Sequence, residues 1–270
     1  MEIERIGSPS REQFREYVRL RKPVVMTDVT SGWKSHAWTL ATLRERMGND
    51  PIDVQRPESD GNFHFIHYQK MPFHEFLERI SGPSPELLYF TKGNSIVGPQ
   101  GKVKREPGSD VVLPGFGDLA LFRSASLSVG SAGTKSVLHH DPLDNLLTPI
   151  TGRKRVTLFL PSDSANIYPY PIHHIRSIIE GRHLDSQMDI EKPDLERFPR
   201  FRKAVPYTST LAAGDMLFLP AGCWHYVQTL DSNMFLNFWY VPPRKAWLMP
   251  PLIHTRIKSK VARVLDWLET

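Results

Sequence analysis

The residues best suited to chemistry in this sequence are two histidines and one aspartate. His139 and Asp141 lie two positions apart in the segment GSAGTKSVLHHDPLDNLLTPITGRKRVTLFLP, residues 130–161. Side chains two apart on a β-strand share a face, so these two point the same way and His140 points the other way. His225 comes later, after an apolar segment and a Pro-Ala-Gly turn. Two imidazoles and one carboxylate on one side of Fe(II) leave three positions open for a cosubstrate and oxygen, so the set predicts a non-haem iron site.

The pair His139 and Asp141 is a weak signal by itself. Short motifs recur by chance, and a lone histidine is more often a satisfied core or surface residue than a metal ligand. The prediction therefore depends on the elements that would bring the three side chains together.

Helices are predicted in the first third of the chain. One begins after Ser10, with Gln13 at the capping-box position, and ends at Leu20 before Pro23 and a short apolar strand. A second helix is predicted to start at Thr39, and a third to cover Phe73–Ile80. The Gly- and Pro-rich stretch 93–117 is predicted to be a long loop, a kind of segment that is usually functional or mobile.

From residue 119 onward, short apolar segments alternate with turn residues, a pattern typical of a sandwich or barrel. The predicted strands include Ser126–Val129, Arg155–Phe159, Ser209–Leu211, Met216–Leu219 and Met234–Tyr240. A polar insertion, 168–202, interrupts this region. The tail 253–268 has an apolar stripe among basic residues, which predicts an amphipathic helix that either packs on the barrel or pairs with another chain. The stripe consists of Ile257, Val261, Val264, Leu265 and Leu268.

Composition narrows the protein class. The 270 residues suffice for one large or two ordinary domains with a real core, and no 18-residue apolar run predicts a membrane span. The N-terminus lacks the apolar stretch of a secretory signal, and the single cysteine, Cys223, excludes an internal disulfide framework. We therefore expect a reducing compartment, the cytoplasm or the nucleus.

The net charge of +5 permits a nucleic-acid partner without establishing one. Much of the excess is scattered over faces expected to be solvated. Basic residues concentrate locally, as at Arg197, Arg200, Arg202 and Lys203, without forming a dense tract or a recognisable RNA-binding motif.

Over residues 10–243 the sequence resembles the JmjC hydroxylases. Four features carry the resemblance, in order and at fitting spacing: the glycine-rich stretch 130–133, the Gly-Arg-Lys turn 152–154, the Pro-to-His stretch 220–225 and the Asn-Phe-Trp strand 237–239. The resemblance implies a mainly β fold with flanking helices, a double-stranded β-helix of the jelly-roll or cupin type. It also implies an N-terminal region 1–118, a β core 119–243 containing the insertion, and a C-terminal helix in 244–270.

The resemblance assigns roles to the site residues. His139, Asp141 and His225 would hold Fe(II), and Lys154 would pair with the distal carboxylate of 2-oxoglutarate. The other cosubstrate residues would be Ser136 and Tyr89, donating to the same carboxylate, Asn145 and Asn237 at the metal-proximal end, and Trp239 behind the second histidine. Strand alternation favours Lys154 over its two arginine neighbours as the inward residue. For Tyr89, a core aromatic role is an equal alternative.

Two features depart from the family pattern. Pro149 falls inside what should be a central strand, which predicts a bulge or an edge because proline cannot donate to the ladder. Cys223 lies two residues before His225, where a small buried hydrophobe is the default and a redox-sensitive thiol the alternative.

The resemblance implies an Fe(II)- and 2-oxoglutarate-dependent dioxygenase that hydroxylates a C–H bond. Within the family the sequence is most similar to the tRNA wybutosine-synthesising hydroxylases, through stretches such as 144–147, 151–156 and 213–218, which suggests a modified tRNA base as the substrate. A protein or peptide hydroxylase, a small-molecule biosynthetic hydroxylase and an inactive cupin that only binds a partner stay open as alternatives. Related hydroxylases dimerise through terminal helices, so the C-terminal helix also suggests a homodimer.

Overall fold

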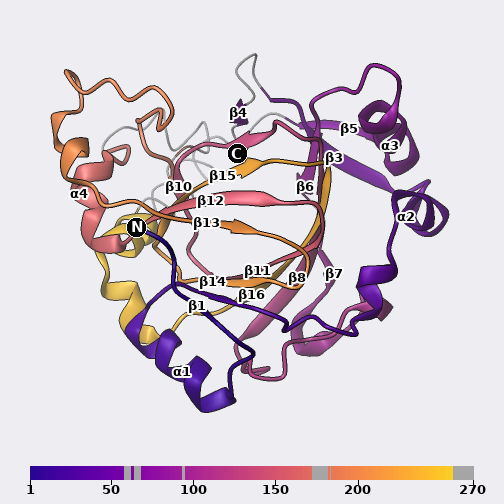
Figure 1. The fold of residues 1–270 in the computed structure, drawn as a ribbon, viewed down its shortest axis with the longest axis horizontal. Helices are drawn as coiled ribbons and strands as arrows, with labels where there is room; N and C mark the ends of the chain where they lie inside the picture. Colours follow the sequence, from indigo (N-terminus) through magenta and orange to yellow (C-terminus); the bar gives the residue numbers. More distant parts are fainter. Residues whose placement is uncertain (58–61, 64–67, 93–94, 172–181, 183, 258–270) are drawn as a thin grey trace, which may run out of the picture.

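The computed structural model describes residues 1–57, 62–63, 68–92, 95–171, 182 and 184–257, with residues 62, 63 and 92 described by their backbone alone. Two β-sheets face each other across the middle of the molecule, and helices lie around their edges (Figure 1). Among the described residues, no helix is long and apolar enough to cross a membrane. The cytoplasmic location stays a prediction.

The larger sheet has ten strands within the described parts of the chain. In spatial order they are β1 (Arg5–Ile6), β2 (Val24–Met26), β14 (Met216–Leu219), β11 (Asp144–Thr151), β16 (Asn233–Tyr240), β8 (Phe122–Gly130), β6 (Tyr89–Lys92), β3 (Pro51–Gln55) and β5 (Tyr68–Pro72), with β7 (Ser95–Val97) paired to β8. The N-terminal region therefore extends the sheet at both ends. The boundary expected near residue 118 stays a prediction.

The smaller sheet carries both histidines of the predicted metal site. Its order is β13 (Tyr207–Leu211), β12 (Lys154–Phe159), β15 (Trp224–Thr229), β9 (Lys135–Ser136) and β4 (Asn62–Phe63), with β10 (His139–His140) paired to β15. From β8 to β16 the chain alternates between the two sheets, except that β9 and β10, and later β12 and β13, follow each other within the smaller one. This is the winding of a double-stranded β-helix, so the predicted fold class is confirmed.

The three predicted helices are present. They are α1 (Arg11–Leu20), α2 (Leu40–Met47) and α3 (Phe73–Ser81). The capping box of α1 forms as expected: the Gln13 amide donates to the Ser10 hydroxyl at 3.2 Å, and the Ser10 amide donates to the Gln13 side chain at 2.8 Å. Thr39 caps α2 in the same way.

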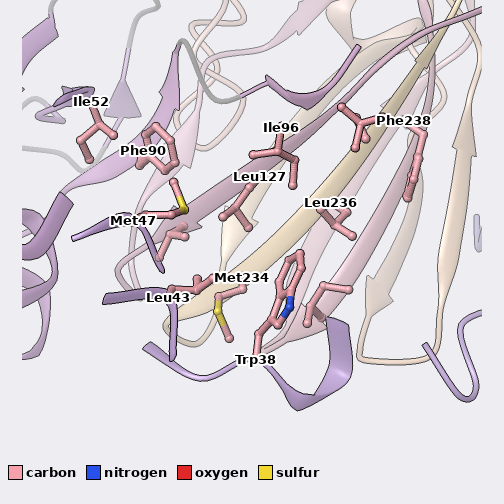
Figure 2. Packing of buried hydrophobic residues seen from close by; sticks show 14 of the residues in the cluster. Trp38, Leu43, Met47, Ile52, Phe90, Ile96, Leu127, Met234, Leu236 and Phe238 are labelled. Atoms are coloured by element: carbon pink, nitrogen blue, oxygen red, sulfur yellow. The ribbon is translucent and has the colours of Figure 1, made fainter. Parts of the chain in front are cut away.

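An apolar core lies between the outer face of the larger sheet and the N-terminal helices (Figure 2). Leu43 and Met47 from α2 share this cluster with Leu127 from β8 and with Leu236 and Phe238 from β16, and all five are almost fully buried. Because side chains alternate along a strand, this packing turns the intervening residues of β8 and β16 towards the space between the sheets. Those residues are polar: Ser126, Ser128 and Asn237.

The stretch 93–117 is not wholly a loop as expected. Its residues 95–97 form β7, which pairs with β8, and short 3₁₀ turns follow at Pro99–Gly101 and Gly108–Asp110. The high Gly and Pro content hid this strand, in which Ile96 and Val97 are buried against the core. The expected insertion follows the short helix α4 (Ser164–Ile167) and separates β12 from β13.

Pro149 lies at an irregularity in β11. The pairing of β11 with β16 shifts register between Pro149 and Thr151, and the pairing with β14 covers only residues 145–147. The missing proline N–H therefore removes no bond to β14, and the prediction of a bulge is confirmed.

The C-terminal helix is described over residues 250–257. It buries Pro251, Leu252 and Thr255, whereas Ile253 and Ile257 are 38% and 41% exposed. Ile257, the first residue of the predicted apolar stripe, is therefore exposed, and packing on the barrel and pairing with another chain both stay predictions. The remainder of the stripe, from Val261 onward, lies outside the described residues, and the homodimer stays a prediction.

Candidate metal and cosubstrate site

The structure brings His139, Asp141 and His225 together at one end of the space between the sheets. One candidate ligand atom from each lies within 4.8 Å of the other two. His139 faces His225 across the β10–β15 pair, with ring centroids 4.1 Å apart. The Nε2 atom of His225 lies 3.5 Å from a carboxylate oxygen of Asp141. This spacing suits three ligands that converge on one ion.

Backbone carbonyls orient the rings of both histidines. His139 Nδ1 lies 2.8 Å from the Val137 carbonyl oxygen, and His225 Nδ1 lies 3.1 Å from that of Cys223. A carbonyl oxygen only accepts hydrogen bonds, so each Nδ1 carries a proton and Nε2 is the ring nitrogen left for a metal. Orientation of metal-binding histidines through the other ring nitrogen is the usual arrangement.

Burial shifts the pKa values of His225 and Asp141 in opposite directions. Burial lowers the pKa of His225 well below its ordinary value, with further lowering from His139, so this imidazole is neutral. Burial raises the pKa of Asp141, and the nearby His139 opposes that shift. A neutral imidazole is the form that binds metal, and a cation between these side chains would favour the Asp141 carboxylate.

A hydrogen-bonded turn positions the ligands. The Gly222 amide donates to the Asp141 carbonyl at 2.9 Å, and the Ala221 amide donates to the Asp144 carboxylate at 2.8 Å. Arg21, at the end of α1, binds both oxygens of Asp144 and reaches the Ala221 carbonyl at 3.3 Å. Hydrogen bonds and an ion pair therefore connect the end of α1, the turn at Ala221–Gly222 and the start of β11 beside the metal ligands.

Lys154 lies in the same cavity as the three candidate ligands. It is only 3% exposed, and its ammonium donates to the Tyr89 hydroxyl at 2.6 Å. The ammonium also lies 4.2 Å from the ring centroid of Phe235. Among the residues that the structure describes, no carboxylate pairs with this ammonium. A buried charge without a counter-ion is costly, so this position favours an anionic ligand.

The other predicted site residues line the same cavity of about 180 Å³. The Ser136 hydroxyl accepts from the Val227 amide at 2.9 Å, which leaves its proton available for a ligand. Asn145 donates to Asn237 at 3.3 Å, and Asn145 Oδ1 is buried with no hydrogen-bond partner among the described residues. These groups are suited to a polar molecule between the sheets.

Trp239 also lines the cavity. It comes from β16 in the larger sheet, whereas His225 comes from β15 in the smaller one, and the packing of Trp239 behind that histidine stays a prediction. Cys223 is buried in an apolar cluster, and burial raises the pKa of its thiol to about 12. The thiol is therefore protonated at neutral pH, as expected of a small buried hydrophobe.

Sequence reasoning missed several residues of the cavity wall. They are Thr91, Ser126, Ser128, Leu147, Leu219, Val227 and Thr229. Alternation along the strand of residues 122–130 could have found Ser126 and Ser128, because both share a face with each other and oppose the core residue Leu127. The contact between Arg21 and Asp144 had no local signal, because the two residues are distant in the chain.

Comparison with known proteins identifies the class to which this fold and site belong. The cupin-like domain family matches residues 9–246, so the chain belongs to that family. The relationship expected from the sequence is confirmed, and relatives of two kinds match over most of the chain.

Zebrafish lysine-specific demethylase 8 is 29% identical over 88% of this chain and 58% of its own length. The zebrafish tRNA wybutosine-synthesizing protein 5 is also 29% identical, over 95% of this chain and 82% of its own length. The human protein of that name is 27% identical over 98% of this chain and 87% of its own length. The chain thus spans little more than half of the demethylase 8 proteins and most of the tRNA proteins.

Proposed function

We propose that this chain is an Fe(II)- and 2-oxoglutarate-dependent dioxygenase that hydroxylates a C–H bond. The observation that carries the proposal is the buried Lys154 ammonium, which shares one cavity with His139, Asp141 and His225 and pairs with no described carboxylate. A metal site alone would fit many proteins. A metal site with a buried cation at the other end of the cavity fits a cosubstrate that carries a carboxylate at each end.

The residues of this cavity suit both Fe(II) and 2-oxoglutarate. His139, Asp141 and His225 would hold Fe(II) through two Nε2 atoms and one carboxylate oxygen, a donor set that leaves positions open. Lys154, Tyr89 and Ser136 would hold the distal carboxylate of 2-oxoglutarate, and Asn145 and Asn237 would line the metal-proximal end. This arrangement supports the family prediction for each residue.

The reaction follows the stoichiometry 2-oxoglutarate + O₂ + R–H → succinate + CO₂ + R–OH. Bound Fe(II) would supply the oxygen chemistry. The chain would supply orientation: Lys154 fixes one end of the cosubstrate, the asparagines fix the other, and the apolar side chains Leu147, Leu219 and Val227 keep water from the cavity.

We propose a modified tRNA base as the first substrate class to test. The tRNA wybutosine-synthesizing relatives match this chain over most of their own length, and the net charge is +5. The demethylase relatives are equally similar in identity, which supports a protein or peptide side chain as the second candidate.

Turnover of 2-oxoglutarate to succinate tests the proposal. We expect slow Fe(II)-dependent turnover without a second substrate, abolished in His139→Ala and Asp141→Ala, and stimulated by tRNA that carries the wybutosine precursor. Stimulation by peptides instead would transfer the assignment to the protein-hydroxylase class. An absence of turnover, together with an absence of metal-dependent 2-oxoglutarate binding by calorimetry, would leave the inactive binding module as the answer.

A further inference from the structure

A group of exposed cations lies on the insertion between β12 and β13. We call Arg197, Arg200, Arg202 and Lys203 the basic insertion surface. All four are exposed, and none forms an ion pair with any residue that the structure describes. No acidic residue occurs between Glu196 and Asp215 in the sequence. Within residues 197–214 the positive charge of this surface therefore meets no acidic residue, and Asp194 and Glu196 precede it directly.

Contacts with aromatic rings and the backbone hold three of these side chains in place. The Arg200 guanidinium lies 4.6 Å from the Tyr168 ring centroid, and that of Arg197 lies 5.0 Å from the Phe198 ring centroid. Arg202 donates to the Leu195 carbonyl at 3.2 Å. A guanidinium group already stacked on a ring loses less conformational entropy on binding an anion than a free one does. The surface is therefore partly preorganised for an anionic ligand.

The surface is attached to β12, the strand that pairs with the strand of His225. The Phe201 ring, within the 3₁₀ turn Pro199–Lys203, lies 5.8 Å from that of Phe159. Phe159 pairs in register with Trp224, the residue next to His225. In Figure 1 the orange segment that carries this surface lies beside α4, on the same side of the molecule as β10.

Backbone hydrogen bonds fix a second part of the insertion to the strand of His139. The Ser186 amide donates to the Leu138 carbonyl at 2.8 Å, and the His140 amide donates to the Leu184 carbonyl at 3.2 Å. The insertion is thus connected to both histidine strands, at the end of the barrel where the candidate ligands meet. A polymer bound along the insertion would have the metal site close by.

We propose that the basic insertion surface binds the phosphodiester backbone of an RNA substrate whose target base enters the metal cavity. The inference rests on the proposed function, because it presumes an oxygenase with a large second substrate. Planar guanidinium groups match phosphate oxygens, and successive phosphates match several cations along one short segment. A small metabolite would need no such surface outside the cavity.

Salt-dependent RNA binding tests this inference. The measurement is fluorescence anisotropy with a labelled tRNA transcript, between about 50 and 200 mM salt, a range in which phosphate contacts dominate affinity. The test variant is Arg197→Gln/Arg200→Gln/Lys203→Gln, which keeps Arg202 because its side chain supports the local backbone. The control is Lys34→Gln/Lys102→Gln/Lys104→Gln, which removes the same charge from exposed lysines that form no ion pair with the described residues.

We expect the test variant to bind the transcript roughly 30- to 300-fold more weakly than wild type at about 0.1 M salt. The slope of log K against log salt should fall by about 2 to 3, as expected for three lost phosphate contacts. The control should change both quantities much less. Thermal unfolding and 2-oxoglutarate turnover without RNA should be unchanged in both variants, because neither alters the cavity.

Three other outcomes would contradict RNA binding by the basic insertion surface. None of them depends on whether the protein is an oxygenase. Equal weakening in the two variants would mean that binding follows net charge and not this surface. A wild-type protein that turns over 2-oxoglutarate but does not bind the transcript would remove RNA as the ligand and leave the oxygenase intact. Loss of binding to an acidic peptide or to anionic vesicles, with no change towards RNA, would reassign the surface to that partner.

Discussion

At the scale of single residues, the most informative feature is a buried cation. Lys154 has a hydroxyl and two aromatic rings as neighbours, and the described residues offer it no counter-charge. Such a position is unfavourable for the protein without ligand and favourable for binding an anion. Stability and ligand affinity should therefore respond in opposite directions when this charge is removed.

We predict that Lys154→Met stabilises the ligand-free protein by about 1 to 3 kcal/mol, because methionine fills a similar volume without a buried charge. The same change should weaken 2-oxoglutarate binding by about 2 to 5 kcal/mol, since the anion loses its partner. Urea denaturation and calorimetry in the presence of Mn(II) measure the two effects. Destabilisation combined with unchanged 2-oxoglutarate affinity would show that Lys154 is a structural residue.

Gly130 controls the position of Tyr89. A Cβ atom at Gly130 would collide with the Tyr89 ring, which lies over the glycine where β6 pairs with β8. We predict that Gly130→Ala displaces the hydroxyl from Lys154 and weakens 2-oxoglutarate binding by about 1 to 2 kcal/mol, the value of one such hydrogen bond.

The matched control is Gly7→Ala, because a Cβ atom there would meet no other atom within 4 Å. Tyr89→Phe should reproduce the loss, and the double variant Gly130→Ala/Tyr89→Phe should lose little more, since both changes remove the same contact. Additive losses would indicate that the glycine acts in some other way.

At the scale of elements, the C-terminal helix supports the turn before His225. Leu252 is fully buried against Ala221 and Ala246, and its side chain would contact a Cβ placed on Gly222 at 3.3 Å. The same turn donates to the Asp141 carbonyl and to the Asp144 carboxylate. The helix therefore acts on the metal ligands through the turn.

We predict that Leu252→Ala costs about 2 to 4 kcal/mol of unfolding free energy and weakens Co(II) or Mn(II) binding by about tenfold. Leu43→Ala, an equally buried leucine in α2, should cost similar stability and leave metal affinity unchanged. Leu252→Met should restore most of the affinity because it conserves volume. Equal metal affinity in the two alanine variants would refute a positioning role.

A second element-scale contact joins α2 to the 3₁₀ turn at Asp110. The Trp38 indole donates to the Asp110 carboxylate at 3.0 Å, and Arg46 pairs with both Asp110 and Glu106. These contacts, the Trp38 hydrogen bond first, hold the pKa of Asp110 below its usual range. A lowered pKa stabilises the fold at pH values above the ordinary aspartate pKa, and that stabilisation is lost as the pH falls through the folded-state value.

We predict that Asp110→Asn lowers the unfolding free energy by about 1 to 2 kcal/mol at neutral pH. The difference from wild type should shrink as the pH falls through the acid range, because both proteins then carry a neutral group. Denaturation series across pH measure this. Asp231→Asn, which breaks the exposed pair with Arg153, should change stability much less than Asp110→Asn at neutral pH, because water screens an exposed ion pair.

At the scale of the whole molecule, the cavity joins the two sheets. Lys154 and both histidines come from the smaller sheet, whereas Tyr89, Asn145 and Asn237 come from the larger one. A ligand held by both sets would connect the sheets across the interior of the barrel. Binding should therefore stabilise the fold as a unit and not only the strands nearest the metal.

We predict that Mn(II) and 2-oxoglutarate together, each at about 100 times its dissociation constant, raise the unfolding free energy by at least about 2.7 kcal/mol. Removing the metal with a chelator should reverse the gain, and Lys154→Met should respond to the metal but hardly to 2-oxoglutarate. Chemical denaturation with and without ligands gives the measurement. A response of wild type to 2-oxoglutarate that does not require metal would argue against a shared site.

The fold class, several helix starts and the candidate metal ligands could be predicted from the sequence alone. Short apolar segments bounded by turn residues predicted the β region, Ser10 and Thr39 marked two helix starts, and the spacing of His139 and Asp141 predicted two neighbouring ligands. These features are local, because each depends on backbone geometry within a few residues. The tertiary structure decided what is distant in the chain: the ring of Tyr89 beside Lys154, the pair of Arg21 and Asp144, and the packing of Leu252 on the turn before His225. Such contacts depend on how the two sheets face each other, and no short stretch of sequence contains that information.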